Sequence, residues 1–494
     1  MDSLISISSL CLKVGEKALL KLPNLEIQEG DVLAVIGESG SGKSLFLKTL
    51  MGLIPSSINT EGEMICLSKD WLKLSSEEIR SERGNNIAMV FQEPMSALNP
   101  QMTCGKQLLE AVLIKKSHSK IEAEKLINDK LQELGLGDIS KRVLESYPHE
   151  LSGGQRQRVM IAMASINNPK IILADEPTTA LDTVSRKTVM EDFLSMVRGQ
   201  NSTLIWVTHE LDIVSSYANK IWVLKQGELI QSGLKDEVLS NPTPYLKELL
   251  TAIPKPKKDR NINSDWEVSI QEISKRYGSK KNGVLALEPY SINIKAGETL
   301  AVIGTSGSGK TTLAKMLVGL ESKTSGKVLI NGVSIPDIAP TGIQMVFQDP
   351  YASLNRKHSS LYAIKEILKL KGIELKNIEK RAFEILKEVG FDDRLINAKP
   401  KQMSGGQRQR LCIAKAIATN PKVLILDEAV AALDPLIQEQ ILSLLKRIQR
   451  ERSLVYIFIT HDLYVARSLA DHWCFLNSGK SGEIPKEWWD STMV

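Results

Sequence analysis

The stretch Gly37-Glu38-Ser39-Gly40-Ser41-Gly42-Lys43-Ser44 decides how the rest of this chain is interpreted. It follows an apolar run at 32–36 that is typical of a buried strand, and it leads into a helix-like segment at 45–50. A glycine-rich turn between a strand and a helix can point several N–H groups at one phosphate. The alternative is a Gly/Ser-rich turn that contains a lysine by chance. The phosphate-binding interpretation makes Lys43 the partner of the β/γ-phosphates and Ser44 a ligand of Mg²⁺. The residues expected to line this loop are Gly37, Ser39, Gly40, Gly42, Lys43 and Ser44.

Length and composition favour a soluble protein with more than one domain. The chain has 494 residues, of which 42% are hydrophobic and 24% charged. Its 63 Lys and Arg against 58 Asp and Glu leave a net charge of +5, too weak to require nucleic-acid binding. The 5 cysteines form no Cys-x-x-Cys pair, so we expect free thiols in a reducing compartment. No apolar run approaches the roughly 18 residues that span a bilayer, and the first residues lack the basic start of a signal peptide. We therefore expect a soluble, cytoplasmic protein that would act at a membrane only through another chain.

The motifs of the first half recur in the same order in the second half. Residues 304–311, Gly-Thr-Ser-Gly-Ser-Gly-Lys-Thr, follow a strand-like run at 299–303 and repeat the opening stretch. A Phe-Gln-acid-Pro motif, a Ser-Gly-Gly-Gln motif, an Asp-Glu pair and a Thr-His pair then follow in both halves. A repeat of this extent indicates two homologous domains. The second set of phosphate-loop residues is Gly304, Ser306, Gly307, Gly309, Lys310 and Thr311, with Thr311 as the Mg²⁺ ligand.

The boundary between the two domains is predicted at residues 254–265, which separate domain 1 (1–253) from domain 2 (266–494). The segment from Pro254 to Arg260 is interrupted by proline, charged, and without apolar periodicity, as a short linker would be. We interpret its basic run as a solvated tether rather than a binding site.

Each copy is predicted to be an α/β domain. The short apolar runs 171–174 and 423–426 suit a parallel sheet that is covered on both faces. Residues 104–134 and 361–389 have the spacing of apolar and charged residues that is typical of helices. We therefore expect a sheet-bearing core with a helical insert in each half.

An Asp-Glu pair follows an apolar run in each copy, Asp175-Glu176 and Asp427-Glu428. A carboxylate at the C-terminal edge of a sheet is placed to hold a phosphate-bound Mg²⁺, which is the role expected of Asp175 and Asp427. Hydrolysis also needs a group that orients and polarises the attacking water. Glu176 and Glu428 are the candidates for that role, and an exposed strand end is the alternative.

Two further pairs are candidates for catalysis. His209 and His461 each end a strand-like run, at the same interval after the Asp-Glu pair, which favours a role at the γ-phosphate over a purely structural one. Gln92 and Gln348 are weaker candidates, because an amide can ligate Mg²⁺ or position water but most glutamines do neither.

The Ser-Gly-Gly motif has no evident role within its own copy, although its N–H groups at a helix start can bind an anion. Leu-Ser-Gly-Gly-Gln at this place resembles the signature of ABC-transporter ATPases, and the other motifs of that family occur in order, twice. The resemblance implies two tandem P-loop domains, each with a RecA-like core and a helical subdomain, that bind ATP and Mg²⁺. It also implies head-to-tail sites that each join one P-loop to the signature of the other copy. The signature residues are Ser152, Gly153, Gly154, Ser404, Gly405 and Gly406.

The finer resemblance is to the ATPases of dipeptide, oligopeptide and nickel importers. The segments 91–100, 147–150 and 241–245 are similar to motifs of that group, and the two ATPases look fused as in glutathione and microcin-type importers. The resemblance implies two membrane-spanning permease subunits, an extracytoplasmic substrate-binding protein, and a peripheral place on the cytoplasmic face of the inner membrane. It implies no nucleic-acid partner, and it leaves the cargo open.

The chain departs from the family pattern at a few positions. Tyr277 stands where the family stacks an aromatic ring on adenine, but Val14 takes that place in the first copy, which predicts weaker nucleotide binding at the Lys43 site. Ala431 replaces a serine that is usual before Leu433.

Three other functions are alternatives to import. A soluble tandem ATPase that acts on ribosomes or nucleic acid would be expected to carry a long charged linker between its copies. An ATP-binding regulator with little turnover would not need both Asp-Glu pairs and both histidines. A sugar importer would have different sequences around Gln92 and Gln348.

Overall fold

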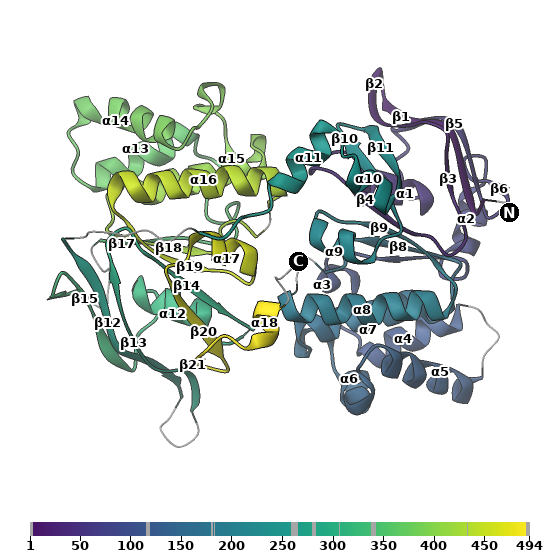
Figure 1. The fold of residues 1–494 in the computed structure, drawn as a ribbon, viewed down its shortest axis with the longest axis horizontal. Helices are drawn as coiled ribbons and strands as arrows, with labels where there is room; N and C mark the ends of the chain where they lie inside the picture. Colours follow the sequence, from purple (N-terminus) through teal and green to yellow (C-terminus); the bar gives the residue numbers. More distant parts are fainter. Residues whose placement is uncertain are drawn as a thin grey trace. The chain divides into compact units, whose positions relative to one another are not determined.

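The computed structural model of the chain forms two compact units, residues 1–251 and 252–493. The structure describes residues 3–114, 119–178, 181, 183–257, 265–278, 283–305, 307–336, 342–431 and 433–490. Ser306 and most of the expected linker, residues 258–264, lie outside the described residues. Each unit is described by itself below (Figure 1).

The first unit has 11 strands and 11 α-helices among its described residues. Its strands are β1 (Ile5–Val14), β2 (Lys17–Leu22), β3 (Leu25–Ile27), β4 (Val32–Ile36), β5 (Asn59–Cys66), β6 (Lys69–Asp70), β7 (Ile87–Val90), β8 (Ile171–Asp175), β9 (Thr203–Val207), β10 (Lys220–Lys225) and β11 (Glu228–Leu234). Its helices are α1 (Lys43–Leu50), α2 (Ser76–Glu82), α3 (Pro94–Ala97), α4 (Cys104–Leu113), α5 (Lys120–Glu133), α6 (Ser140–Glu145), α7 (Gly153–Ser165), α8 (Thr183–Gly199), α9 (Leu211–Tyr217), α10 (Lys235–Ser240) and α11 (Pro244–Thr251).

The second unit repeats this order with fewer elements. Its strands are β12 (Glu267–Tyr277), β13 (Val284–Lys295), β14 (Thr299–Gly304), β15 (Ser325–Ile330), β16 (Val333–Ser334), β17 (Ile343–Val346), β18 (Val423–Asp427), β19 (Val455–Ile459), β20 (His472–Asn477) and β21 (Lys480–Gly482). Its helices are α12 (Lys310–Leu317), α13 (Ser360–Leu370), α14 (Leu375–Glu388), α15 (Gly405–Ile417), α16 (Pro435–Arg452), α17 (Leu463–Leu469) and α18 (Lys486–Asp490).

A parallel sheet forms the centre of each unit. In the first unit its order is β10-β4-β9-β8-β7, and in the second it is β17-β18-β19-β14-β20. Strands β4 and β9 are buried along their whole length, which explains why both read as continuous apolar runs. Because the strands are parallel, the loops that carry the phosphate motif, the glutamine, the Asp-Glu pair and the histidine all leave the same edge of the sheet.

The sheet of the second unit separates two hydrophobic cores. Leu424 and Leu426 of β18 pack in one core with α13–α16, whereas Val423 and Ile425 pack in the other core with α12 and the β12–β13 strands. Successive side chains of a strand point to opposite faces, so this one strand contributes to both layers. Figure 1 shows α13–α16 grouped on one side of this sheet.

An antiparallel layer accompanies each parallel sheet and was not expected from the sequence. In the first unit β1 pairs antiparallel with β2, β3 and β5. In the second unit β12 pairs with β13 and β15 in the same way. Phe46 and Leu47 of α1 are fully buried in one core with Ile5 and Leu12 of β1. The helix that follows the phosphate loop is thus held between the two kinds of strand.

The expected helical inserts are present in both copies. Helix α4 packs on α5, α6 and α7, and α13 packs on α14 and α15. The Ser-Gly-Gly motif begins the last helix of each insert, α7 or α15.

One residue of the expected linker is held against the second unit, whereas Lys255 and Pro256 are exposed. The Lys257 N–H donates to the Arg467 carbonyl, and Lys257 Nζ lies 2.5 Å from Asp471 Oδ2 in a half-buried ion pair. Residue 257 is thereby fixed to the second unit.

Among the residues that the structure describes, no helix is long and apolar enough to cross a lipid bilayer.

Candidate functional site

The phosphate loop of the first copy lies between β4 and α1, as predicted. Gly40 and Gly42 have φ angles of 80° and 100°, in the region that favours glycine. Gly37 has a φ of 149°, and a Cβ atom there would lie 2.1 Å from the Leu224 carbonyl oxygen of β10. Close approach of two strands therefore requires glycine at position 37.

The loop of the second copy reproduces this geometry between β14 and α12. Gly304, Gly307 and Gly309 have φ angles of 149°, 78° and 105°. A Cβ atom at Gly304 would lie 2.0 Å from the Leu476 carbonyl oxygen of β20. The same backbone path is thus encoded twice, by glycines at corresponding positions.

The lysine of each loop folds back over the loop that precedes it. Lys43 Nζ donates to the Gly37 carbonyl at 2.7 Å and to the Glu38 carbonyl at 2.8 Å. Lys310 Nζ donates to the corresponding carbonyls of Gly304 and Thr305 at 2.8 and 2.7 Å. Lys43 and Lys310 are both buried, so each ammonium group is held against the loop that is predicted to bind phosphate.

Both loops have room and polar groups for a phosphate chain. A Cβ atom added at Gly40 or Gly307 would meet nothing within 4 Å, so the loop is open there. The hydroxyls of Ser41 and Ser308 are buried, and no described residue forms a hydrogen bond with either. The exposed side chain of Ser39 lies on the same open loop. Open backbone and unsatisfied polar atoms fit a ligand rich in hydrogen-bonding oxygens.

Two of the three expected metal ligands, Ser44 and Asp175, meet in the first copy. The hydroxyl of Ser44, in the first turn of α1, donates to Oδ1 of Asp175, at the end of β8, at 3.1 Å. Burial raises the pKa of Asp175, and neighbouring Glu176 adds to this, while the bond from Ser44 opposes it. A hydroxyl and a carboxylate are hard oxygen ligands, and Mg²⁺ is commonly held by one or two protein ligands plus phosphate oxygens. The donor set therefore fits Mg²⁺ bound together with a nucleotide.

The corresponding pair in the second copy is arranged differently. Thr311 is exposed on the first turn of α12, and Asp427 is buried at the end of β18. Burial and the charge of Glu428 raise the pKa of Asp427 to about 6, against the opposing effect of Lys310. This carboxyl thus gives up its proton less readily than an ordinary aspartate.

Three predicted catalytic side chains meet in each copy. In the first, Gln92 Nε2 donates to Glu176 Oε2 at 2.8 Å, and His209 Nδ1 lies 3.2 Å from Glu176 Oε1. Each of these partners comes from a different strand end, β7, β8 or β9.

The second copy contains the same triad. Gln348 Nε2 donates to Glu428 Oε2 at 2.7 Å, and His461 Nδ1 lies 3.2 Å from Glu428 Oε1. The glutamine, which was the weakest candidate in the sequence, is thus in contact with the strongest one.

Each glutamate of the triad has a left-handed backbone. Glu176 and Glu428 both have a φ of 47°, and their N–H groups donate to the carbonyls of Val207 and Ile459 at 2.9 Å.

Burial lowers the pKa of His209, but the hydrogen bond to Glu176 and the charge of Glu176 outweigh burial and raise that pKa overall. Burial raises the pKa of Glu428, but the bond and charge of His461 outweigh it, so that pKa is lowered. A lowered pKa keeps Glu428 ionised and able to accept a proton.

The signature residues begin α7 and α15 with the same capping arrangement. The Ser152 hydroxyl accepts from the Gln155 N–H, and the Gln155 side chain accepts from the Ser152 N–H. Ser404 and Gln407 form the same reciprocal pair in the second copy. Ser152 and Ser404 are exposed, and a Cβ atom at Gly154 would meet nothing within 4 Å. The motif therefore presents a preformed helix start at the surface of its own unit.

Tyr277 and Val14 occupy equivalent places. Each is the last residue of the first strand of its copy, and each is followed by a glycine with positive φ. Both side chains are more than two-fifths exposed, at 43% and 44%. The aromatic ring is therefore available on one copy and replaced by an aliphatic side chain on the other.

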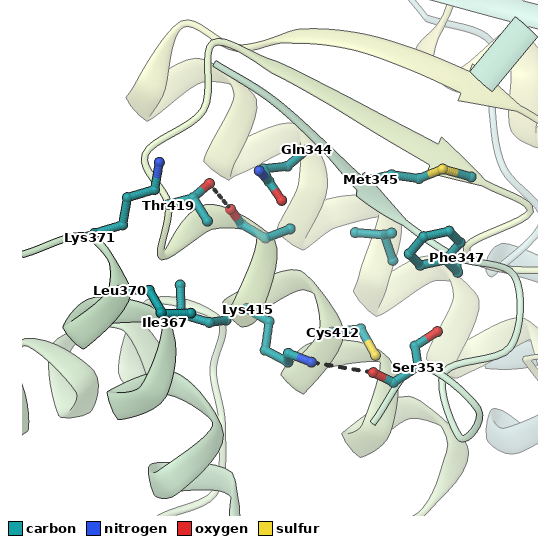
Figure 2. A pocket seen from close by; sticks show the side chains of 12 residues that line it. Gln344, Met345, Phe347, Ser353, Ile367, Leu370, Lys371, Cys412, Lys415 and Thr419 are labelled. Carbon is teal, nitrogen blue, oxygen red and sulfur yellow. Dashed lines mark hydrogen bonds between the residues drawn. The ribbon is translucent and has the colours of Figure 1, made fainter. Parts of the chain in front are cut away.

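A separate cavity of about 330 Å³ lies in the second unit, away from the phosphate loop (Figure 2). Its walls include Phe347, next to Gln348, together with Leu370 of α13 and Cys412 and Lys415 of α15. Burial raises the pKa of Cys412 to about 12, although Lys415 opposes this, so the thiol stays protonated. The cavity belongs to the join between the core and the helical insert.

Two features beside the first site escaped the sequence analysis. Glu210, which directly follows His209, accepts a bond from the Thr178 hydroxyl at 2.7 Å and pairs with Arg186 of α8 at 2.9 Å. The Tyr245 hydroxyl accepts a bond from the N–H of Glu38 within the phosphate loop at 3.1 Å. The acidic residue after the Thr-His pair was a visible signal for the first feature. Tyr245 was visible only as part of a proline-containing motif.

Comparison with known proteins gives consistent results for both halves. The family model described as ABC transporter matches residues 20–179 and 287–431. The peptidoglycan transport ATP-binding protein YejF of Agrobacterium fabrum is 36% identical over 477 residues, which cover 92% of this chain and 87% of that protein. The glutathione import ATP-binding protein GsiA of Salmonella paratyphi A is 35% identical over 511 residues, with coverage of 93% and 82%.

A solved structure extends the likeness over nearly the whole chain. The archaeal ribosome recycling factor aABCE1, solved with the ribosomal stalk protein aP1, has a TM-score of 0.64 and covers 95% of this chain and 88% of its own. Its sequence identity is 21%, so this likeness shows the fold alone. With two matched domains, two complete sets of motifs and relatives aligned along most of its length, the chain belongs to the ABC transporter family, as an ATPase whose hydrolysis of ATP is coupled to transport.

Proposed function

We propose that this chain is the fused ATPase subunit of an importer for peptides or related small solutes, with two chemically competent ATP sites. The observation that carries the proposal is the Gln-Glu-His triad at the sheet edge of both units. We further propose that residues 1–253 and 266–494 are its two ATPase domains, joined by 254–265.

The residues of each copy divide the work of hydrolysis. The loop N–H groups and Lys43 or Lys310 bind the phosphates and compensate the charge that develops during transfer. Glu176 or Glu428 accepts a proton from the attacking water, and the histidine and glutamine orient that carboxylate. Mg²⁺ bound with ATP would be held by Ser44, Asp175 and Gln92 in the first copy and by Thr311, Asp427 and Gln348 in the second, and it would neutralise phosphate charge.

The signature supports a composite site. Its capped helix start lies at the surface, and it bonds to no residue of its own phosphate loop among the contacts described. We propose that the loop at 37–44 is completed by 404–406 and the loop at 304–311 by 152–154. ATP bound between two such surfaces would favour the closed arrangement, and hydrolysis would release it.

The partners and cargo follow from the relatives. YejF and GsiA are named for peptidoglycan transport and glutathione import. We propose that this chain works with two membrane-spanning permease subunits and an extracytoplasmic binding protein, on the cytoplasmic face of the membrane. Small peptides are the favoured class of cargo, and a nickel or metal chelate is the alternative.

Replacement of both glutamates by glutamine tests the catalytic proposal. Glu176→Gln with Glu428→Gln keeps the size and one oxygen of each side chain but removes the proton acceptor, so turnover should fall by at least about 100-fold. ATP should stay bound through gel filtration. Glu451→Gln, on the exposed face of α16, is the matched control and should hydrolyse ATP like the parent. Normal turnover in the double variant would show that these carboxylates are not the proton acceptors.

Co-purification from native membranes tests the transport proposal. Two polytopic membrane proteins in stoichiometric amounts are the expected result. Recovery with ribosomes would favour the rival function, a soluble tandem ATPase that acts on ribosomes or nucleic acid.

A further inference from the structure

Helix α11 ends the first unit and carries a tyrosine that touches the phosphate loop. The Tyr245 hydroxyl accepts a hydrogen bond from the backbone N–H of Glu38 at 3.1 Å. Only 5% of Tyr245 is exposed, and Lys225 Nζ lies over its ring at 4.4 Å from the centroid. The ring of Tyr245 is thus held by Lys225, and its hydroxyl is held by the phosphate loop.

The start of α11 is itself anchored to the sheet. Gln231 of β11 donates through Nε2 to the Asn241 carbonyl at 2.9 Å, and its Oε1 accepts from the Thr243 N–H at 3.0 Å. One amide side chain therefore fixes both ends of the turn that leads into the helix. Gln231 thus holds the turn before α11, and Tyr245 in the first turn of α11 bonds to Glu38, so β11 is connected to the phosphate loop.

Tyr245 holds one side of a peptide group whose other side is held by the loop lysine. The Gly37 carbonyl accepts from Lys43 Nζ at 2.7 Å, and the N–H of the same peptide group, which belongs to Glu38, donates to Tyr245. When Lys43 turns toward a phosphate it gives up its carbonyl contacts, while the bond to Tyr245 is unaffected because it lies on the N–H side. The loop then keeps its shape at the moment when the nucleotide needs it.

We propose that Tyr245 is a positioning residue for the phosphate loop of the first copy, and that its hydroxyl pre-organises this loop for ATP. The proposal rests on the function proposed above for residues 37–44. A pre-organised loop binds more tightly because less conformational freedom is lost on binding. The Tyr245 hydroxyl bonds to a backbone N–H of the loop, so we expect it to affect ATP affinity rather than the chemical step.

The second copy is built differently at this place. Asn477 of β20 stands where the first copy has Lys225 of β10, and the short helix α18 packs Trp488 on Phe475 at 5.1 Å between ring centroids. Thr305 stands where the first copy has Glu38. Among the hydrogen bonds that the structure describes, the one between a phosphate loop and the last helix of its unit occurs in the first copy, which has Val14 instead of an aromatic ring.

Tyr245→Phe is the direct test, because it removes one oxygen and keeps the ring. The full-length chain with Lys310→Ala serves as parent, so that nucleotide binding reports the first site. We expect Tyr245→Phe to raise the Kd for ATP by about three- to tenfold, the range that corresponds to loss of one hydrogen bond. We also expect faster hydrogen exchange at the Glu38 amide, with the thermal unfolding temperature within a few degrees of the parent.

Two controls separate the possible outcomes. Tyr217→Phe removes a hydroxyl that donates to Glu191 at 3.0 Å on the exposed face of the same unit, and it should leave the Kd unchanged. Lys43→Ala in the same parent should abolish binding. If Lys43→Ala still binds ATP, the proposed function of the loop is wrong. If Lys43→Ala abolishes binding and Tyr245→Phe binds like the parent, the role assigned to Tyr245 is wrong.

A second variant covers the case in which Tyr245→Phe fails to fold. An amide-to-ester replacement at residue 38 removes the N–H donor and leaves both side chains in place. It should weaken ATP binding by a similar factor, and an unchanged Kd would overturn the proposal.

Discussion

The backbone conformation of Glu176 and of Glu428 is determined by contacts with the neighbouring strand. A φ of 47° is unfavourable for a side chain other than glycine, asparagine or aspartate, by about 1–3 kcal/mol. Each N–H is nevertheless tied to the neighbouring strand at 2.9 Å, which keeps the unfavourable conformation in place. The result is a carboxylate turned toward the histidine and the glutamine. Strain at this position is therefore the local cost of placing the carboxylate that we propose as the proton acceptor.

His209 should titrate above the ordinary histidine pKa of 6.5, because Glu176 stabilises its charged form more than burial opposes it. The charged form then contributes stability that is complete below about 6.5 and is lost as the pH rises through the raised pKa. Glu176→Gln removes the charge and should lower this pKa. Histidine NMR titration of the two proteins checks the prediction, and Glu191→Gln is a distant control. An equal or higher pKa in Glu176→Gln would contradict it.

Adenine affinity should respond to the exchange of Val14 and Tyr277. Val14→Tyr adds a ring where the second copy has one, so the first site should bind ATP more tightly by about 1 kcal/mol, roughly fivefold. Tyr277→Val should weaken the second site by a similar amount. Titration with the other site silenced, by Lys310→Ala or Lys43→Ala, measures each. Equal affinities of the two parent sites would contradict the premise that the ring matters.

At the scale of elements, the parallel sheet explains why distant motifs meet. The apolar runs, the glycine loops and the acidic strand ends could be predicted, because each is a local pattern with its own physical cause. The contact between Gln92 and Glu176 could not, since it depends on β7 lying beside β8 in the sheet. The antiparallel strands were also missed: β1 alternates buried and exposed residues only irregularly, with a shift in register near Leu12. Tyr245 was missed because its partner is a backbone N–H, which leaves no trace in the sequence.

The join between β4 and β10 should be sensitive to a single methyl group. Gly37→Ala places a Cβ atom against the Leu224 carbonyl, so we expect the nucleotide-free protein to lose about 1–3 kcal/mol of stability relative to Gly40→Ala. Gly40→Ala is the matched control, because it also has positive φ but meets no neighbour within 4 Å. Chemical denaturation of both variants decides the matter, and equal stabilities would show that the strands can separate at no cost.

At the scale of the whole molecule, the chain combines two copies whose catalytic triads match but whose surroundings differ. The first copy has Val14, the Tyr245 contact and a bond between Ser44 and Asp175. The second has Tyr277 and a more isolated Asp427, whose pKa is raised to about 6. If each site joins one loop to the signature of the other copy, as proposed above, fusion into one chain gives each site the same two sets of residues and lets such differences persist.

Paired substitutions can show which signature serves which loop. If each loop is completed by the other copy, Lys43→Ala with Ser404→Arg damages one site twice and should leave one nucleotide bound per chain. Lys43→Ala with Ser152→Arg damages both sites and should leave none. Both serines cap helices in the same way, so the two variants lose similar stability. The reverse pattern of nucleotide stoichiometry would mean that each copy completes its own site.

The hydrogen bonds that hold Glu176 and Glu428 also affect how strongly these carboxylates bind a proton. A carboxylate with one oxygen on an amide and the other near an imidazole is a weaker proton acceptor than an uncommitted one. ATP is always present in a cell, and an ATPase that hydrolysed it without transporting cargo would only release heat. The glutamine that would orient each carboxylate thus also weakens it as a base, so we expect the rate of hydrolysis to respond to any movement of Gln92 or Gln348.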